Sequence, residues 1–262
     1  MPLDRPFPMP AAQHAPQKWL ALDTTTEQLS VAVGVDAPEG GVPRLWEAVE
    51  PGGARASSRV IALVFEGLER AGLRLADLDA IAFGAGPGAF TGLRTACAVA
   101  QGLGFGAQRP LLPVDSLLAL AETARIQMAA PESPLEVLSV LDARMGEFYA
   151  GHYRWDGARW QTVQTWPALT GPALAAAIEG SGRRPDWIVG NAVGVAGAEA
   201  FLSLWPEGAR RSAIPGAAAM VRLAPELCRA GLAVAAEAAE PHYVRDKVAQ
   251  TTVERQAAGG RR

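Results

Sequence analysis

Apolar runs that end in an aspartate open each half of the chain. In the first half, KWLALD ends at Asp23, a polar turn follows, and an alternating apolar pattern resumes at Leu29. In the second half, EVLSVLD ends at Asp142, and another apolar run starts at Glu147 after a polar turn. Each pattern predicts a strand, a tight turn and a second strand. Because the unit recurs, we expect a duplicated domain with little residue identity between its copies.

Segments with helical periodicity lie between the predicted strands. A third strand is expected at about 44–50, and the short apolar run DAIAFGAG leads into a glycine-rich stretch. Ser57 or Ser58 is a candidate N-cap of the first helix, and Gly72 stands where that helix should end. Strands that alternate with helices indicate α/β architecture in both halves. The predicted helices are about 58–71, 92–106, 116–127, 173–179 and 217–230.

The order of these segments suggests four parts of the chain. We expect an N-terminal domain at 18–112, a diverged C-terminal domain at 113–238, and tails at 1–17 and 239–262. The first tail holds five prolines and no continuous apolar run, which predicts disorder rather than a signal peptide or a membrane anchor. No stretch of eighteen or more apolar residues occurs, so we expect a cytoplasmic protein without a membrane partner.

The composition of the chain limits the kinds of ligand that it can bind. With 262 residues, 49% hydrophobic and 19% charged, the chain can bury a sizeable core. Its net charge of −3 supplies no strong field for nucleic acid, so most phosphate contacts to any RNA should come from elsewhere. Cys97 and Cys228 form no CxxC pair, and none of the three histidines belongs to a metal-binding motif. We therefore expect no metal site.

The stretch GAGPGAFTGLRTACAVAQGLGFG has the layout of a phosphate-binding loop. Gly86 and Gly88 flank a proline and permit a tight turn, and Thr91 is a candidate N-cap for the helix that follows. Free N–H groups at a helix N-terminus attract an anion, which Arg94 would reinforce. Against this, the stretch matches neither GxxxxGK[ST] nor GxGxxG, and it holds no lysine.

The aspartate turns allow two interpretations. Asp23 and Asp142 could bind a magnesium–phosphate unit if both faced one cleft, with hydroxyls from Thr24 and Thr25 nearby. Alternatively, each aspartate caps its own turn through hydrogen bonds to the backbone. We favour the cap for Asp142 and leave both open for Asp23. The candidate nucleotide or anion site consists of Asp23, Thr24, Thr25, Gly86, Gly88, Thr91 and Arg94.

Small residues recur every four positions along the helix after the loop, which lets another helix approach closely. The preceding helix carries apolar residues on more than one side, so it needs a partner besides its own sheet. Burial between the domains is the alternative; we favour a partner interface. The candidate interface residues are Val60, Ile61, Val64, Leu68, Gly92, Ala96, Ala100 and Gly104.

Several segments together resemble the TsaB family, bacterial subunits of tRNA threonylcarbamoyladenosine biosynthesis. They are LALDTTTEQLSVAV, GAGPGAFTGLRTACAVAQGLGFG, PVDSLLALA, VLDARMGEFYA and YVRDKVAQTTVER, and the resemblance spans about 18–255. The family belongs to the acetate and sugar kinase, Hsc70 and actin superfamily. The resemblance therefore implies two duplicated actin-like or sugar-kinase-like domains, the second diverged.

The resemblance also implies a role in placing a threonylcarbamoyl group on the tRNA adenosine beside the anticodon. The related subunit TsaD binds metal through a histidine pair, and the matching positions here are Ser116 and Leu120, so this chain lacks those ligands. The resemblance implies a non-catalytic partner subunit that binds TsaD directly, with the ATPase TsaE in the assembly and tRNA held indirectly. It would have no cofactor of its own, and ATP and metal would sit on partner subunits. A homodimer through the same helices is a further expectation.

Two other hypotheses come from different classes. A stand-alone kinase-like ATPase would use Asp23, Thr24 and the loop 86–94, but the turn lacks a glycine and the loop lacks a lysine. A peptidase has no mechanism here, because the sequence offers no metal-binding pair and no GxSxG nucleophile motif.

Overall fold

The computed structural model describes residues 17–36, 44–53, 56–128 and 133–244. The predicted proline-rich tail, apart from Gln17, lies outside the described residues, as does the end of the predicted C-terminal tail beyond Val244. Within the described ranges, no helix is long and apolar enough to cross a membrane.

The first sheet has five strands in the order β3-β2-β1-β4-β5. The first three form an antiparallel meander, and β4 and β5 run parallel to β1. Apolar residues fill both faces of β1 and β4, as expected for strands covered on two sides. The strands are β1 Lys18–Asp23, β2 Gln28–Val35, β3 Arg44–Pro51, β4 Ala80–Gly86 and β5 Leu111–Asp115.

The second sheet has five strands in the order β10-β9-β6-β7-β8. Here too the first three strands in sequence form an antiparallel meander, while β9 pairs parallel with β6 and β10 parallel with β9. The two sheets thus share one strand order, which supports duplication; the duplication itself stays a hypothesis. The strands are β6 Leu135–Arg144, β7 Glu147–Trp155, β8 Trp160–Thr170, β9 Trp187–Val189 and β10 Arg210–Arg211.

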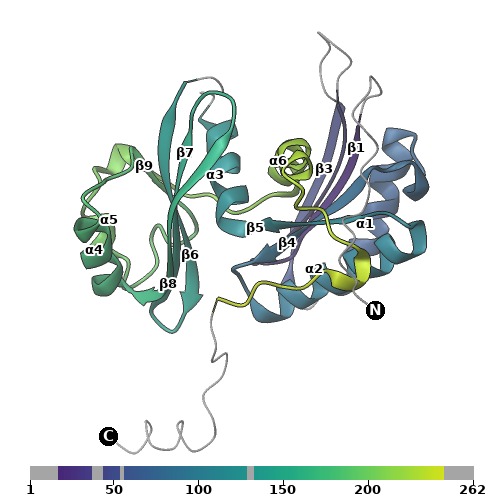
Figure 1. Cartoon of the computed structure of the whole chain (residues 1–262). Coiled ribbons are helices and arrows are strands. Elements are labelled where there is room, and N and C mark those ends of the chain that lie inside the picture. The colour runs from purple at the N-terminus through teal and green to yellow at the C-terminus, as the bar shows by residue number, and fades with distance from the viewer. Residues whose placement is uncertain (1–16, 37–43, 54–55, 129–132, 245–262) are drawn as a thin grey trace, which may run out of the picture.

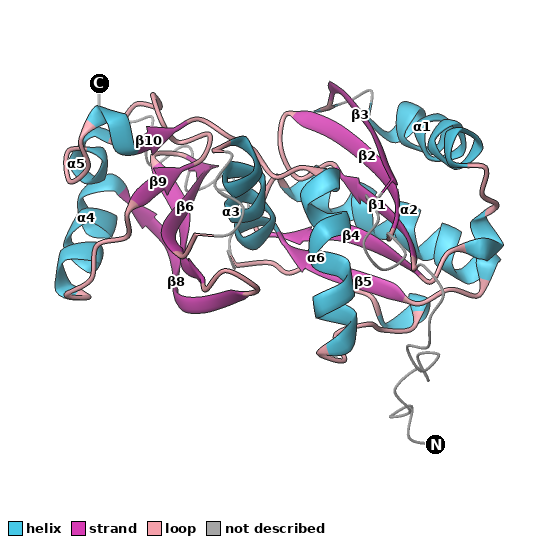
Figure 2. Ribbon diagram, turned by 90° about the horizontal axis from the view of Figure 1, so that it is seen from above, coloured by secondary structure: helices cyan, strands magenta, loops and turns pink. Residues whose placement is uncertain are grey.

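Helices separate and cover the sheets in layers (Figures 1 and 2). Helices α1 and α2 cover the outer face of the first sheet, and α4 and α5 cover the outer face of the second. Between the sheets lie α3, which packs on β6 and β7, and α6, which packs on β1 and β2. The helices are α1 Ala56–Ala71, α2 Phe90–Ala107, α3 Ser116–Gln127, α4 Gly171–Gly180, α5 Glu199–Leu202 and α6 Ala217–Arg229; short 3₁₀ turns occupy Leu75–Asp77, Glu207–Ala209 and Ala236–Ala238.

One apolar cluster crosses the middle layer and joins the two halves. It includes Trp19 on β1, Leu120 on α3, Met220 on α6 and Tyr153 on β7, all at most 1% exposed. Helix α6 falls in the predicted C-terminal domain, yet it lies on the first sheet, where Val221 fills the space beside Gly34. The halves therefore share a core.

Two predicted helix starts were wrong. Helix α1 begins at Ala56, so Ser57 and Ser58 lie inside its first turn. Helix α2 begins at Phe90 with Ala89 at the N-cap, so Thr91 lies in the first turn and makes no cap. Ala89 takes this position because its N–H donates to the Thr25 carbonyl, a contact distant in sequence. The end of α1 was confirmed: Gly72 has a φ of 67° after the last turn.

Candidate functional site

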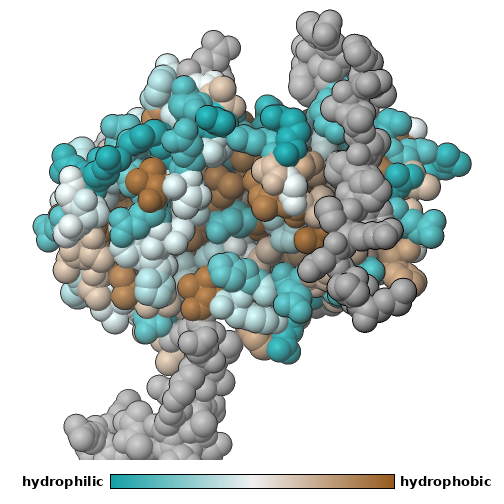
Figure 3. All heavy atoms as spheres, viewed as in Figure 1, coloured by the Kyte–Doolittle hydropathy of each residue, from teal (hydrophilic) through white to brown (hydrophobic). Residues whose placement is uncertain are grey.

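A cleft of about 390 Å³ lies between the two halves, and both aspartate turns line it. The first half contributes the β1–β2 turn and the loop after β4, and the second contributes the β6–β7 turn and Asn191. His242, Tyr243 and Val244, the last described residues, also line it. In the space-filling view, hydrophobic side chains gather between the two halves (Figure 3). The cleft thus combines apolar walls with a few polar groups, the usual make-up of a ligand pocket.

Asp23 ends β1 inside the protein, with 1% of its surface exposed. Its Oδ1 accepts hydrogen bonds from the backbone N–H and the Oγ1 hydroxyl of Thr25, at 2.7 and 2.8 Å. Its Oδ2 faces Gly84 and has no hydrogen-bond partner among the described residues. Burial raises the pKa of Asp23 to about 6, although the two hydrogen bonds from Thr25 lower it. The carboxylate therefore caps its own turn and reaches the cleft only after a rearrangement.

The glycines of the loop after β4 let that loop pack against the β1–β2 turn. The Thr24 hydroxyl donates to the Gly92 carbonyl at 2.6 Å, and the Ala89 N–H donates to the Thr25 carbonyl at 2.7 Å. A Cβ on Gly92 would overlap the Thr24 carbonyl, and one on Gly88 would overlap the Thr25 backbone. These glycines therefore have a structural reason that needs no phosphate.

The C-terminal segment lies across the same loop. The His242 N–H donates to the Ala85 carbonyl at 2.7 Å, and a Cβ on Gly86 would meet the His242 carbonyl oxygen at 2.6 Å. Arg94 stacks on the Phe90 ring, 3.9 Å from its centroid, and donates to the Tyr243 hydroxyl at 3.0 Å. Contacts within the chain thus occupy the side chains of Asp23, Thr24, Thr25 and Arg94, four of the residues predicted to bind an anion. Nucleotide binding at this loop stays a hypothesis, and these contacts count against it.

The β6–β7 turn repeats the geometry of the first turn at the cleft surface. Asp142 Oδ1 accepts from the Arg144 N–H at 2.7 Å, so Asp142 caps its turn as we favoured. Arg144 and Met145 have φ values of 65° and 58°, a left-handed conformation that costs non-glycine residues about 1–2 kcal/mol each. Met145 is 62% exposed in the cleft wall. Strain of this kind, held in a cleft, is frequent at functional sites.

Among the residues that the structure describes, no three His, Cys, Asp or Glu side chains form a group that could hold a metal ion. Ser116 and Leu120, at the positions that match a histidine pair, are both fully buried. The Ser116 hydroxyl contacts the Thr25 hydroxyl at 3.4 Å. Ser116 is the first residue of α3, directly after β5, and Leu120 lies one turn further along that helix.

Most of the predicted interface residues face the protein's own sheet and not a partner. Ala96, Ala100 and Gly104 lie inside the protein, and a Cβ on Gly104 would meet Leu111 on β5. Val60, Val64 and Leu68 are buried against the same sheet, and Gly92 packs on Thr24. The small-residue ridge therefore brings α2 close to its own sheet, and the prediction that it receives a second helix was wrong. Ile61, at 40% exposure, is on the surface.

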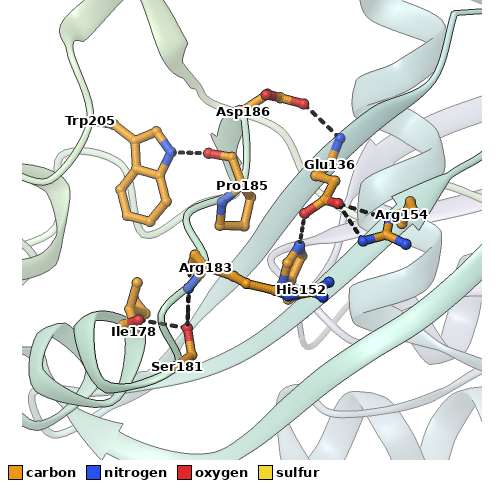
Figure 4. A network of polar contacts seen from close by, with 9 residues as sticks. All are labelled: Glu136, His152, Arg154, Ile178, Ser181, Arg183, Pro185, Asp186 and Trp205. Carbon is orange, nitrogen blue, oxygen red and sulfur yellow. Dashed lines mark hydrogen bonds and ion pairs between the residues drawn. The ribbon is translucent and has the colours of Figure 1, made fainter.

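The second half holds a partly buried polar network away from the cleft (Figure 4). His152 lies 2.8 Å from Glu136 Oε2, and Arg154 donates to Glu136 Oε1 at 2.8 Å. Burial lowers the pKa of His152, and the hydrogen bond to Glu136 opposes this shift. Burial raises the pKa of Glu136, but the hydrogen bonds from Arg154 and His152 outweigh it and leave the value low. The network ties β6 to β7, a structural role.

Sequence reasoning did not single out three of the cleft residues, Asn191, His242 and Tyr243. Asn191 Oδ1 accepts from the Asp142 N–H at 2.9 Å, a pairing across 49 residues of sequence. The sequence signal for it was a glycine before an asparagine directly after an apolar strand. His242 and Tyr243 reach the cleft only because the chain returns to the first half, which no local pattern indicates.

Three comparisons with known proteins bear on the family of this chain. Residues 50–169 match the profile described as TsaD: tRNA N6-adenosine threonylcarbamoyltransferase. The crystal structure of an uncharacterized Pseudomonas aeruginosa protein with similarity to peptidase YEAZ superposes with a TM-score of 0.70 at 33% identity, covering 87% of this chain and 100% of that one. A Haemophilus influenzae protein named tRNA threonylcarbamoyladenosine biosynthesis protein TsaB is 38% identical over 50% of this chain and 51% of its own. The Escherichia coli protein of the same name is 33% identical over 88% of this chain and 95% of its own. With that extent of similarity, the chain belongs to the TsaB family.

Proposed function

We propose that this protein acts in threonylcarbamoyladenosine synthesis on tRNA, as a non-catalytic subunit that binds the transferase TsaD. The observation that carries the proposal is similarity over nearly the whole chain to a protein named for that biosynthesis. The partial match to the transferase profile supports a common ancestor with the catalytic subunit. The subunit has no cofactor of its own in this proposal; ATP and metal act on partner subunits, TsaE joins the assembly, and tRNA is held through the complex.

The cleft contacts favour a supporting role over catalysis. Asp23 is buried behind its turn, and the loop after β4 is packed against Thr24 and Thr25 and crossed by His242. A kinase-like enzyme needs these groups free to meet phosphate. The alternative, a stand-alone ATPase, therefore requires the C-terminal segment to leave the loop before nucleotide binds.

An exposed face on α1 and α2 suits a protein partner. We name it the helix-pair face: Ile61 and Phe65 on α1, and Ala98, Gly102 and Phe105 on α2. Phe65 is 53% exposed and Phe105 is 77% exposed, and a Cβ on Gly102 would meet open space. The α2 members lie at i, i+4 and i+7, so they share one side of the helix. Exposed aromatic side chains beside small residues are typical of a protein interface.

The test is a reconstituted modification assay. It contains tRNA, threonine, bicarbonate, ATP, the carbamoyl-adenylate synthase, TsaD and TsaE, and the modified nucleoside is measured by mass spectrometry. We expect modification only when this chain is present. The variant Phe65→Asp/Phe105→Asp should lose it together with binding to TsaD, measured by titration calorimetry. Val49→Asp is the matched control, because Val49 is 52% exposed on β3, away from the helix-pair face, and it should retain both.

Two results would overturn parts of the proposal. If the assay proceeds equally without this chain, the role in synthesis fails. If the double variant keeps full activity and binding, the role stands and the helix-pair face is the wrong surface. Sedimentation of the free chain tests the expected homodimer, since the double variant should then be monomeric. Tight nucleotide binding by the isolated chain, abolished by Arg94→Ala, would favour the ATPase hypothesis.

A further inference from the structure

A second hollow, of about 520 Å³, lies on the protein where the ends of β2 and β3, helix α6 and the end of β7 meet. We name it the α6 groove. Its apolar lining includes Val35, Leu45, Val221 and Trp155, and Leu45 is 38% exposed there. Arg222 and Arg229 stand on its α6 side, and both are exposed. The groove shares no lining residue with the cleft between the aspartate turns or with the helix-pair face, so it is a separate surface.

The aromatic wall of the α6 groove is held in place before any ligand arrives. The Arg125 guanidinium stacks on Trp155 at 4.3 Å from the ring centroid. Arg125 is itself fixed by two hydrogen bonds to Glu122, each 2.7 Å long. Trp160 packs against Trp155 with the ring centroids 5.5 Å apart. A wall with a fixed indole ring costs little entropy on binding.

Helix α6 carries a proline on the side of the groove. Pro225 lies inside the helix, and proline has no N–H to offer the carbonyl of Val221 four residues earlier. Both Val221 and Pro225 line the groove. The α6 side of the groove is therefore lined by the proline ring as well as by Val221.

The N-terminal tail enters the described structure at the edge of this groove. The carbonyl of Gln17, the first described residue, accepts a hydrogen bond from the N–H of Asp36 at 2.8 Å, and Asp36 lines the groove. The tail contains the run PFPMP, residues 6–10, in which prolines alternate with Phe7 and Met9. Prolines at this density favour the extended polyproline II conformation, which aromatic-lined grooves recognise.

The lengths agree. Residues 11–16 separate this run from Gln17 and can span up to about 20 Å when extended. From Val221 to Arg229, helix α6 is about 12 Å long at 1.5 Å per residue. Four residues of polyproline II cover about the same distance at 3.1 Å each. The tail therefore reaches the whole groove from its point of entry.

We propose that residues 6–10 of the tail dock in the α6 groove of their own chain. With three residues per turn, Phe7 and Pro10 share one face of the segment and Pro6 and Met9 the next, while Pro8 turns away from the groove. Phe7 and Met9 then cover Leu45 and Trp155. The proposal gives a docked position to a tail whose composition alone predicts disorder.

The test places a nitroxide spin label at Ala12→Cys in the full chain. Cys97 and Cys228 are 4% and 6% exposed, so the new thiol is the one that reacts. Paramagnetic broadening of backbone amide signals is then measured for Val35, Leu45 and residues 221–229. We expect strong broadening there. A tethered tail passes near the groove even when undocked, so the decisive measurement is the loss of broadening in Phe7→Ser/Met9→Ser, which keeps every proline and charge.

A groove variant and its matched control complete the experiment. Leu45→Asp should abolish the broadening at residues 221–229, whereas Val49→Asp, an exposed apolar residue on the same strand, should leave it intact. Equal broadening in the parent and in Phe7→Ser/Met9→Ser would overturn the proposal. A mixture of isotope-labelled chains without the nitroxide and unlabelled chains with it distinguishes a second copy. Broadening at the groove in that mixture would also overturn docking within one chain.

Discussion

The carboxylate of Asp23 stands where a side chain on Gly84 would have to lie. A Cβ on Gly84 would overlap Asp23 Oδ2 and would come within 2.8 Å of the Thr25 methyl group. Asp23 and Gly84 belong to neighbouring parallel strands, β1 and β4, so the pair fixes the spacing at the end of the sheet where both turns begin. The same contact leaves Oδ2 without a polar partner.

The first prediction concerns pH. Because the pKa of Asp23 is about 6 in the folded protein and 3.8 is its ordinary value, the folded state holds this proton more tightly than the unfolded state. The contribution of Asp23 to stability is therefore greatest below pH 4 and is lost as pH rises to 6, by about 3 kcal/mol. Asp23→Asn should remove this slope. Urea unfolding of both proteins between pH 4 and pH 7 measures it, and parallel curves would contradict the assignment.

The second prediction separates glycines that contact backbone from glycines that face solvent. Gly88→Ala should destabilise the protein by about 1–3 kcal/mol, because the new methyl group overlaps the Thr25 backbone. Gly102→Ala is the matched control. It lies inside α2 with open space around it, so alanine should stabilise by up to about 1 kcal/mol. Thermal unfolding measures both. A neutral Gly88→Ala would mean that the loop and the turn are not packed as described.

The third prediction concerns the buried ion pair in the middle layer. Glu122 and Arg125 form a two-pronged pair on α3, and the Trp160 indole N–H also donates to Glu122, at 2.9 Å. Glu122→Gln removes the buried carboxylate charge that binds both the Arg125 guanidinium and the Trp160 indole N–H, so it should cost about 3–5 kcal/mol in the free energy of unfolding. Replacing both residues, as Glu122→Leu/Arg125→Met, should cost much less. Chemical denaturation decides, and equal losses for the two variants would show that the charge itself is not the cause.

The fourth prediction separates residues of α1 and α2 that stabilise the fold from residues that are exposed and available to a partner. Ala96→Asp puts a charge into a fully buried position and should lower stability by several kcal/mol, on the order of the cost of burying an unpaired charge. Phe65→Asp changes an exposed side chain and should shift stability by about 0.5 kcal/mol or less. Melting temperatures compare the two directly. Comparable destabilisation by both would mean that Phe65 is covered in the free protein.

The elements that follow from local pattern were recovered from the sequence, and the contacts between distant segments were not. The apolar runs ending at Asp23 and Asp142 predicted strand–turn–strand units, and both aspartates bond to the N–H two residues on. The orientation of α2 was missed, because small residues at Ala96 and Ala100 allow close packing against a sheet as well as against a helix. Its true start depended on Thr25, a residue far back in the chain.

In the cleft, too, local features were predicted from the sequence and contacts between distant segments were not. Its turns were predicted, because the β1–β2 and β6–β7 hairpins each carry their own signal. The return of His242 and Tyr243 to the first half was not, since it depends on a path through α6 that local sequence does not encode. The two-sided apolar pattern of α1 predicted an exposed apolar side and included Ile61, but it did not single out Phe65. Exposure of Phe105 required knowing which side of α2 meets the sheet.

The position of helix α6 prevents the protein from being cut into two fragments that fold on their own. The chain completes the first sheet, builds the second, and then sends α6 back to cover β1 and β2. A truncation after β5 would strip the inner face of the first sheet and expose Trp19 and Ala32 to water. A fragment that begins at α3 would carry α6 without the strands it covers. Neither fragment is a closed unit, so proteolytic dissection should yield one resistant body rather than two lobes.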